Sequence, residues 1–201
     1  MECAAASTAP LTVTWPGKTA VLEFFRAPRQ GANDEAGGDR WIDGDTPAVA
    51  RLRRRASEIA RAGAALVVVE GEPGTGKLHV AKWIHLCGHR ADRALAVLDA
   101  TEPDATQQLA ELRAAVRDGV PAVPGSLVIR NYHAASSGFI HLLLDLLAVQ
   151  NGEPTCAIVL LCSRPVAEVR GQSLQHAQML GRAARATLEI PPLRRRKADI
   201  P

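Results

Sequence analysis

The sequence predicts an α/β fold in which a parallel sheet of five strands is flanked by helices, with a short β-hairpin ahead of it. Apolar runs of strand length alternate along the chain with segments of helical hydrophobic period, as in a parallel sheet with both faces covered. The hydrophobic fraction is 47% but the aromatic fraction only 3%, so the core must consist of Ala, Val, Leu and Ile. A length of 201 residues suits one domain of ordinary size.

A hairpin and a linker are expected before the sheet. Leu11 to Trp15 alternates apolar and polar residues, a Pro-Gly turn signal follows, and Ala20 to Phe25 is a second extended run. From Ala27 to Asp45 the composition shifts to Pro, Gly, Asp, Asn and Arg, which is typical of a linker or surface loop. We therefore expect residues 1–40 to form the hairpin and linker, and residues 41–201 to form the nucleotide-binding domain that the motifs below indicate.

An amphipathic helix is expected next. Asp45, Thr46 and Pro47 combine capping side chains with a proline in the first helical turn. The apolar positions that follow recur at helical spacing up to Gly63; they are Val49, Leu52, Ala56, Ile59 and Ala60. This helix leads into the first strand of the sheet, Ala65 to Val69.

A glycine-rich loop joins that strand to a helix from Leu78 to Leu86, whose inner side we expect to carry Val80, Trp83, Ile84 and Leu86. The loop has the G-x-x-x-x-G-K spacing of a phosphate-binding loop, in which backbone N–H groups turn inward and the lysine reaches the outer phosphates. Strand, loop and helix in this order place those N–H groups and the positive end of the helix dipole together. The structural alternative is a glycine-rich turn without a ligand. The candidate nucleotide-binding residues are Gly71, Glu72, Pro73, Gly74, Thr75, Gly76, Lys77 and Leu78.

The remaining elements continue the alternation. Further strands are expected at Ala94 to Leu98, Ser126 to Ile129, Ala157 to Leu161 and Ala186 to Ile190. Helices are expected at Thr106 to Asp118, Ser137 to Val149 and Gln172 to Ala184. The inward positions of the first two helices are Leu109, Leu112 and Val116, followed by Phe139, Ile140, Leu143, Leu144 and Leu147.

Charge and hydropathy exclude several classes of protein. A net charge of +3 gives no case for nucleic-acid binding by charge alone. The basic runs Arg53 to Arg55 and Arg194 to Lys197 are typical of solvated faces. The cysteines form no C-x-x-C pair, which argues against a zinc ribbon or a redox motif. No apolar run reaches membrane-spanning length and no signal-peptide pattern occurs, so we expect a cytoplasmic protein with no membrane partner.

Three motifs together resemble a known family. Gly71 to His85 resembles the Walker A segment G-E-S-G-T-G-K-E-x-x-A-R-x-I-H of the AAA+ module in bacterial enhancer-binding proteins, the sigma-54 activators. Gly44 to Val49 resembles the family's G-x-S-P-x-M segment, and Ile190 to Pro201 is similar to its L-P-P-L-R-E-R-x-E-D-I-P segment. The resemblance covers residues 41–201 and implies a P-loop AAA+ fold, ATP or ADP as the cofactor, a homo-oligomer, and work with the transcription machinery. The family carries glutamate after the Walker lysine, so Leu78 departs less from it than from the general motif, which has Ser or Thr there to hold magnesium.

The chain departs from the family at the Walker B segment. The family has G-T-L-F-L-D-E, and the matching stretch Gly125 to Asn131 is GSLVIRN. In the family the aspartate organises magnesium and the glutamate orients the attacking water, and both roles need a carboxylate. Arg130 and Asn131 supply none; an arginine there repels Mg²⁺ but is able to contact phosphate oxygens. We therefore expect very slow or absent hydrolysis and no metal ligands; an Arg130 that faces solvent leads to the same expectation for hydrolysis.

Two further family positions are altered. The sensor sequence T-N-R corresponds to Cys162-Ser163-Arg164, where Ser163 offers a weaker hydrogen bond than asparagine. Two family arginines that reach the neighbouring subunit's nucleotide correspond to His176 and Arg182, so the resemblance implies a single trans-acting arginine.

Some family segments have no counterpart. The G-A-F-T-G-A loop that grips sigma-54 is missing, because Asp99 to Gly125 has room only for a short helix. The family continues beyond the equivalent of Pro201 into a helical lid and a helix-turn-helix domain. We therefore expect a piece of a regulator, or a truncated one, without a lid, whose DNA contact depends on a helix-turn-helix outside this chain.

Three hypotheses follow. The first is a degenerate AAA+ module of a transcriptional regulator that binds nucleotide and acts in oligomerisation or signal relay. The second is an active ATPase driving transcription activation, with a substitute carboxylate such as Asp99 or Glu70. The third is a nucleotide-free structural domain that serves oligomerisation.

Overall fold

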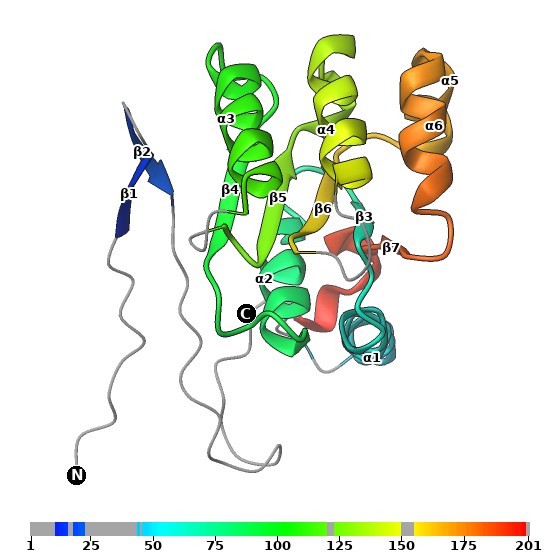
Figure 1. The fold of residues 1–201 in the computed structure, drawn as a ribbon. Helices are drawn as coiled ribbons and strands as arrows, with labels where there is room; N and C mark the ends of the chain where they lie inside the picture. Colours follow the sequence, from blue (N-terminus) through cyan, green and yellow to red (C-terminus); the bar gives the residue numbers. More distant parts are fainter. Residues whose placement is uncertain are drawn as a thin grey trace, which may run out of the picture.

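A five-stranded parallel sheet lies at the centre of the computed structural model, which describes residues 11–15, 18–22, 44, 46–119, 123–149 and 155–199 (Figure 1). Its strands are β3 (Leu66–Glu70), β4 (Leu95–Asp99), β5 (Ser126–Arg130), β6 (Ala157–Cys162) and β7 (Thr187–Glu189). The strand order is β4-β5-β6-β3-β7, and every neighbouring pair is parallel. The predicted α/β fold with five parallel strands is confirmed.

Helices cover both faces of the sheet because its side chains alternate in direction. Val67 and Val69 belong to a core with α1 and α2, whereas Leu66 and Val68 belong to a core with α3, α4 and α6. Figure 1 shows these two layers on opposite sides of the sheet. The helices are α1 (Pro47–Arg61), α2 (Lys77–Cys87), α3 (Ala105–Arg117), α4 (Ser137–Val149), α5 (Val166–Gln172) and α6 (Leu174–Arg182).

Helix α1 begins where the sequence predicts. Thr46 is the N-cap, and its hydroxyl oxygen accepts a hydrogen bond from the Val49 N–H at 3.4 Å. Pro47 occupies the first turn, where its missing N–H costs nothing. All five predicted apolar positions of α1 are buried. Asp45 lies outside the described residues.

The predicted hairpin is present, with one boundary shifted. Strand β1 (Leu11–Trp15) pairs antiparallel with β2 (Lys18–Leu22), and Trp15 stands opposite Lys18. The second strand therefore begins two residues before the predicted Ala20, because the pairing continues up to the turn. The turn itself lies outside the described residues, as does the predicted linker apart from Gly44.

The helix predicted at Gln172 to Ala184 is present as α6, which is shorter and begins at Leu174. Helix α5 lies ahead of it, and the two helices are separated by Ser173 in an extended conformation. The Ser173 hydroxyl accepts a hydrogen bond from the His176 N–H at 3.2 Å, so it caps α6 and interrupts the helical run. Helix α5 was not predicted.

The predicted inward faces of three helices need correction. Ala115 and Leu146 are buried, whereas the predicted Val116 and Leu147 are only partly buried, because α3 and α4 pack against each other as well as against the sheet.

On α2, Lys82 and His85 are buried, while the predicted Trp83 and Leu86 are half-buried. The Trp83 side chain lies toward α1, where its indole N–H donates to the Ser57 hydroxyl at 2.9 Å. His85 is buried with a polar partner, because its Nδ1 lies 2.9 Å from the Ser126 hydroxyl oxygen.

In the described part of the chain, none of the helices combines the length and the apolar character needed to cross a membrane.

Replacement of Leu143 by alanine tests the core under α4. This side chain is 0% exposed, so we expect Leu143→Ala to lower the free energy of unfolding by about 3 kcal/mol in urea titrations. Leu174 is 81% exposed, and the matched change Leu174→Ala should alter it by no more than about 0.5 kcal/mol. Equal effects of the two changes would contradict the packing.

Candidate functional site

The glycine-rich loop leaves the carboxyl end of β3, the strand that lies between β6 and β7. Its base is fixed on both sides. The Gly71 N–H donates to the Cys162 carbonyl oxygen at 3.1 Å, and the Ile190 N–H donates to the Glu70 carbonyl oxygen at 2.8 Å. The loop then enters α2, which begins at Lys77. Strand ends of this kind are where ligands bind in open parallel sheets.

Glycine is required at three positions of the loop. Gly74 and Gly76 have φ angles of 78° and 87°, in the left-handed region that favours glycine. A Cβ atom on Gly71 would lie 2.9 Å from the Thr75 hydroxyl oxygen and 3.2 Å from the Ile190 Cβ. The Thr75 hydroxyl in turn donates to the Glu72 carbonyl oxygen at 2.7 Å. The loop is thus a tight turn that is closed by the hydrogen bond of the Thr75 side chain.

Lys77 lies over the loop. Its ammonium group donates to the carbonyl oxygens of Gly71 and Glu72, both at 2.8 Å. Burial lowers the pKa of this lysine. Gly76 is the N-cap of α2 and has no side chain to cap the helix, so the first-turn N–H groups of α2 remain for an anion.

A buried arginine from the end of the described chain supports the loop. Arg196 lies between two short 3-10 turns, η2 (Leu193–Arg195) and η3 (Lys197–Asp199). It is 8% exposed, and its guanidinium donates to the Thr75 carbonyl oxygen at 2.9 Å. The expectation that Arg194 to Lys197 form a solvated run is therefore wrong at Arg196, because the loop backbone offers it an acceptor.

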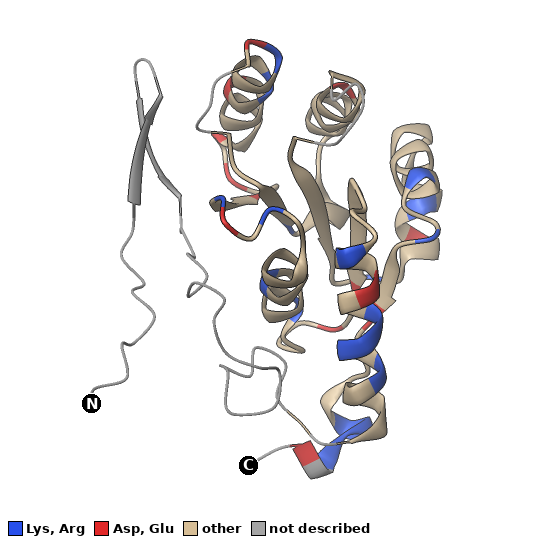
Figure 2. Cartoon of the chain, turned by 60° about the horizontal axis from the view of Figure 1, so that its bottom comes forward, with Lys and Arg blue, Asp and Glu red and all other residues tan. Residues whose placement is uncertain are grey.

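Two more contacts join these turns to distant segments. Arg194 forms an exposed ion pair with Glu72 at 2.7 Å, and this bond lowers the pKa of the Glu72 carboxyl. Asp199 accepts hydrogen bonds from the N–H of Thr46 at 3.0 Å and from its hydroxyl at 2.7 Å. Figure 2 shows Lys and Arg along α1 and on these turns, which meet at the start of the helix.

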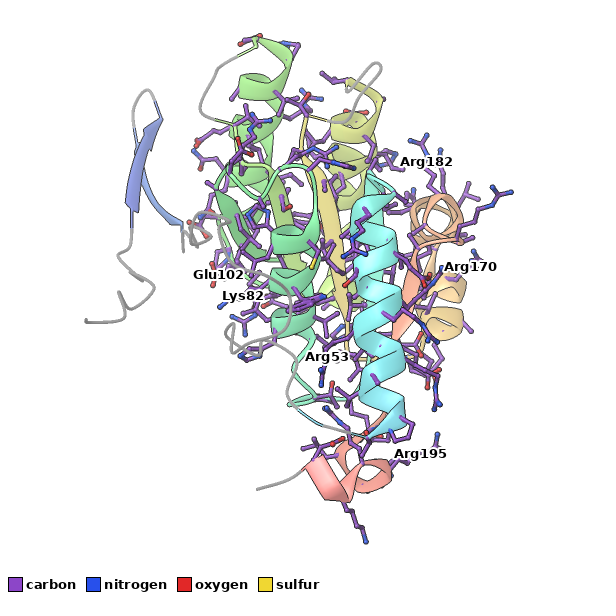
Figure 3. All side chains as sticks on the ribbon, turned by 90° about the horizontal axis from the view of Figure 1, so that it is seen from below. Arg53, Lys82, Glu102, Arg170, Arg182 and Arg195 are labelled. Carbon is purple, nitrogen blue, oxygen red and sulfur yellow. The ribbon has the colours of Figure 1, made fainter. Side chains whose placement is uncertain are left out.

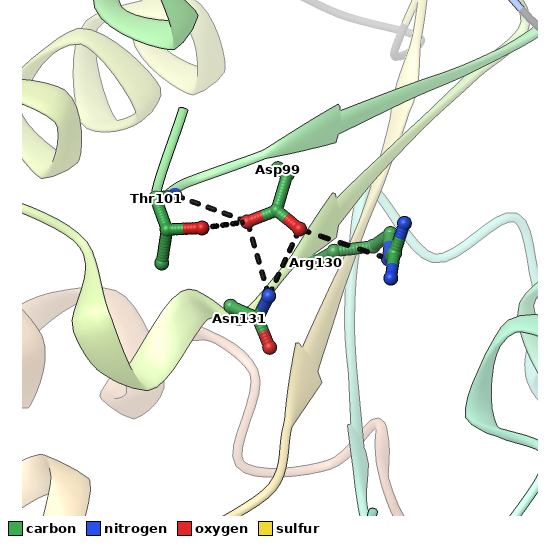
Figure 4. A network of polar contacts seen from close by, with 4 residues as sticks. All are labelled: Asp99, Thr101, Arg130 and Asn131. Atoms are coloured by element: carbon green, nitrogen blue, oxygen red, sulfur yellow. Dashed lines mark hydrogen bonds and ion pairs between the residues drawn. The ribbon is translucent and has the colours of Figure 1, made fainter. Parts of the chain in front are cut away.

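Arg130 and Asn131, at the positions the resemblance aligned with the Walker B acids, both contact Asp99 (Figure 4). The Asn131 amide donates to both carboxylate oxygens of Asp99, at 3.0 and 2.9 Å. The Thr101 N–H and hydroxyl donate to the same carboxylate at 3.0 and 2.6 Å. The Arg130 guanidinium lies 3.8 Å from it. Asn131 adopts a left-handed φ of 52°, which turns its amide toward Asp99.

This network lowers the pKa of Asp99. Burial by itself would raise it, but the bonds from Thr101 and Asn131 and the charge of Arg130 outweigh that effect. The Asp99 carboxylate therefore stays ionised and accepts hydrogen bonds from protein donors.

His133 lies at the same edge of the sheet and was missed by sequence reasoning. It belongs to the turn η1 (Tyr132–Ala134) directly after β5, and its ring Nδ1 lies 3.5 Å from the N–H of Ser163. Burial and the charges of Arg164 and Lys77 lower the pKa of His133. The signal that could have identified His133 is its place just after the end of a strand. Ser163, which the resemblance aligned with the family's sensor, is half-buried beside it.

The two positions matched to trans-acting arginines lie in different surroundings. His176 is buried; its Nδ1 lies 2.9 Å from the Ser173 hydroxyl, and its ring packs edge-on against Tyr132 with centroids 5.4 Å apart. This histidine cannot reach another subunit, because it belongs to the core. Arg182 is exposed at the end of α6, and Figure 3 shows it pointing away from the body of the protein.

Among the described residues, no group of three or more His, Cys, Asp or Glu side chains is arranged to hold a metal ion. Leu78, which follows the loop lysine, has no side-chain oxygen to offer one.

This chain matches a known family model and is similar to known proteins. A family model described as the sigma-54 interaction domain matches residues 44–193. The Nif-specific regulatory protein of Bradyrhizobium diazoefficiens is 29% identical in an alignment over 181 residues, and the match covers 80% of this chain and 31% of that protein. The chain thus spans about a third of the length of this relative.

Solved structures share the fold. NtrX from Brucella abortus in complex with ATP has a TM-score of 0.64 and 16% identity, over 79% of this chain and 38% of the other. The P-loop NTPase domain of a sigma-54 transport activator from E. coli has a TM-score of 0.56 and 20% identity, over 72% of this chain and 97% of the other. Because the identities are only 16% and 20%, these structural similarities are evidence for the fold alone.

The change Asn131→Gly tests the Asp99 network without backbone strain, because glycine accepts the left-handed φ at this position. We expect the pKa of Asp99 to rise toward its ordinary value of 3.8, as measured by carboxyl carbon NMR. The depressed pKa stabilises the fold above pH 3.8, and this stabilisation is lost as the pH falls through the folded pKa. The variant should therefore lose less stability on acidification. Gln107→Ala removes an exposed amide that bonds Glu111 and should leave the pKa of Asp99 unchanged.

The change Gly71→Ala tests the close approach at the loop. The added Cβ would crowd Thr75 and Ile190, so we expect the free energy of unfolding to fall by about 1–3 kcal/mol in urea titrations. A Cβ on Gly138 in α4 meets nothing within 4 Å, so Gly138→Ala should be neutral or stabilising by up to about 1 kcal/mol. If Gly71→Ala left the free energy of unfolding unchanged, the loop would have space for a Cβ atom at this position.

Proposed function

This chain belongs to the sigma-54 interaction domain family, and we propose that it is an ATP-binding module of a transcriptional regulator in which hydrolysis is very slow or absent. In this proposal the module acts in oligomerisation or signal relay. Since the chain covers 31% of the Nif-specific regulatory protein, the partners and activity of a whole regulator are part of the proposal.

One observation carries the proposal: the Walker B positions hold donors where hydrolysis needs acceptors. Arg130 and Asn131 both direct nitrogen atoms at Asp99. Arg130 has no acceptor atom for a metal, and the neutral Asn131 amide lacks the charge and basicity with which a carboxylate activates water. The loop, by contrast, keeps the glycine conformations, the lysine and the helix start that a phosphate needs.

ATP or ADP is the cofactor proposed for the loop. NtrX from Brucella abortus, which shares the fold, forms complexes with both nucleotides. By analogy the phosphates would lie against Gly71 to Leu78, with Lys77 exchanging the carbonyl oxygens of its own loop for phosphate oxygens.

The substitute carboxylates of an active ATPase are engaged elsewhere. Glu70 accepts a hydrogen bond from the Val166 N–H at 2.9 Å, at the start of α5. Asp99 is held by Thr101 and Asn131. Both acids therefore support structure, which favours the non-hydrolysing module over the ATPase. The third hypothesis, a purely structural domain, differs from the first only in nucleotide occupancy.

Contacts of the loop support a relay. Thr75 is joined to Arg196 in the C-terminal turns, and Asp199 in the same turns holds Thr46 at the start of α1. A change in loop conformation on nucleotide binding would therefore reach two distant segments. In an assembly of several copies, the exposed Arg182 is the side chain we propose to reach a neighbouring nucleotide site.

Titration calorimetry with ATP and magnesium tests nucleotide binding. The Lys77 ammonium makes charge-assisted bonds to phosphate, so we expect Lys77→Ala to weaken ATP binding by about 10- to 100-fold. Lys197 is exposed on η3, and Lys197→Ala should leave the affinity unchanged. Phosphate release by the wild-type protein should not exceed that of Lys77→Ala.

Two outcomes would reject this proposal. Steady phosphate release that disappears in Lys77→Ala would identify an active ATPase. Absence of both ATP and ADP binding in a folded protein would favour the structural domain.

A further inference from the structure

Magnesium, which the fold family uses with its nucleotide, does not fit the residues at this edge of the sheet. Mg²⁺ takes oxygen ligands in octahedral geometry. The residue after the loop lysine is Leu78, which has no side-chain oxygen, and Arg130 places a positive charge at the end of β5. Such a charge repels a divalent cation at short range.

The carboxylates nearest the strand ends are already bound by protein donors. Asp99 accepts from Thr101 and Asn131. Glu70 accepts from the backbone at Val166, and Glu72 is paired with Arg194. A metal would have to compete with these donors for a charged ligand.

Positive groups, in contrast, gather at the same edge. Arg130 ends β5, Arg164 follows β6, and Lys77 follows the loop after β3, and these three strands are consecutive neighbours in the sheet. Two strand spacings amount to about 10 Å, a distance that extended arginine and lysine side chains cover when they converge from both sides. His133 lies at the same edge, where its Nδ1 accepts a hydrogen bond from the Ser163 N–H.

Arg130 is held by a long ion pair. Its side chain is 54% exposed, and its guanidinium stands 3.8 Å from Asp99, which is longer than the 2.7 Å of the Arg194 pair. Asp99 is 13% exposed, but an ion pair of this length with its guanidinium in solvent contributes little to stability. Its guanidinium is therefore free to turn toward a phosphate, which it matches in shape and charge.

We propose that this site takes the metal-free form of a nucleoside triphosphate, and that Arg130 with Lys77 neutralises the phosphate charge that Mg²⁺ neutralises elsewhere in the family. The inference rests on the proposed function, because it presumes that the loop binds nucleotide. Chelation by Mg²⁺ reduces the negative charge of ATP, so a site built from protein cations binds the free anion more tightly.

Calorimetric titration of the full chain with ATP in two buffers, one with excess Mg²⁺ and one with a chelator, tests the proposal. We expect ATP to bind in the chelator buffer, and excess Mg²⁺ to weaken it by about tenfold. Arg130→Gln should weaken binding in the chelator buffer by about tenfold, and Arg130→Lys should restore most of it. Arg170→Gln, an exposed arginine on α5 (Figure 3), should change neither affinity.

The outcomes distinguish a failure of the metal-free site from a failure of nucleotide binding itself. Binding that requires Mg²⁺ overturns the metal-free site and leaves nucleotide binding in place. Absence of binding in both buffers overturns the nucleotide binding on which the inference depends. An unchanged affinity of Arg130→Gln, with an unchanged melting temperature, overturns the role of Arg130.

Discussion

The burial of β3 between two strands and two layers of helices is the constraint on which the rest of the structure depends. Its valine and leucine side chains alternate between the two cores, and its backbone bonds β6 on one side and β7 on the other. A strand held in this way fixes the position of the residue that follows it. Gly71 therefore meets the end of β6, and the loop closes within a few residues because Gly74 and Gly76 accept left-handed backbone angles.

A network of side chains occupies the neighbouring strand ends, and Asp99 is its centre. Donors from β5 and from the turn after β4 converge on one carboxylate. The network ties β4 to the end of β5, and it uses the acid that a metal site would need. Binding of an anion and hydrolysis of a phosphate bond make different demands, since the first needs donors and the second also needs acceptors. The proposed function rests on this difference between the groups needed to bind an anion and the groups needed to hydrolyse a phosphate bond.

The C-terminal turns form a third layer of support behind the loop. A buried guanidinium needs an acceptor, and Arg196 finds one in the backbone of Thr75. Asp199, three residues later, accepts from Thr46 and so holds the N-terminus of α1. The C-terminal turns thus contact both the loop and the start of α1, although these residues are far apart in the sequence.

The sequence by itself determined the alternation of strands and helices, the glycine-rich loop and the five buried positions of α1, because hydrophobic period, capping and glycine spacing are local properties. It also indicated that carboxylates were missing after β5. The partners of the charged residues were decided only by the tertiary structure. Arg196 bonds a residue 121 positions away, and Asn131 bonds one 32 positions away. A run of arginines has the same sequence whether it is solvated or buried, and His176 likewise became a core residue because the fold packed it against Tyr132. Such burial depends on long-range packing, which no local pattern of residues specifies.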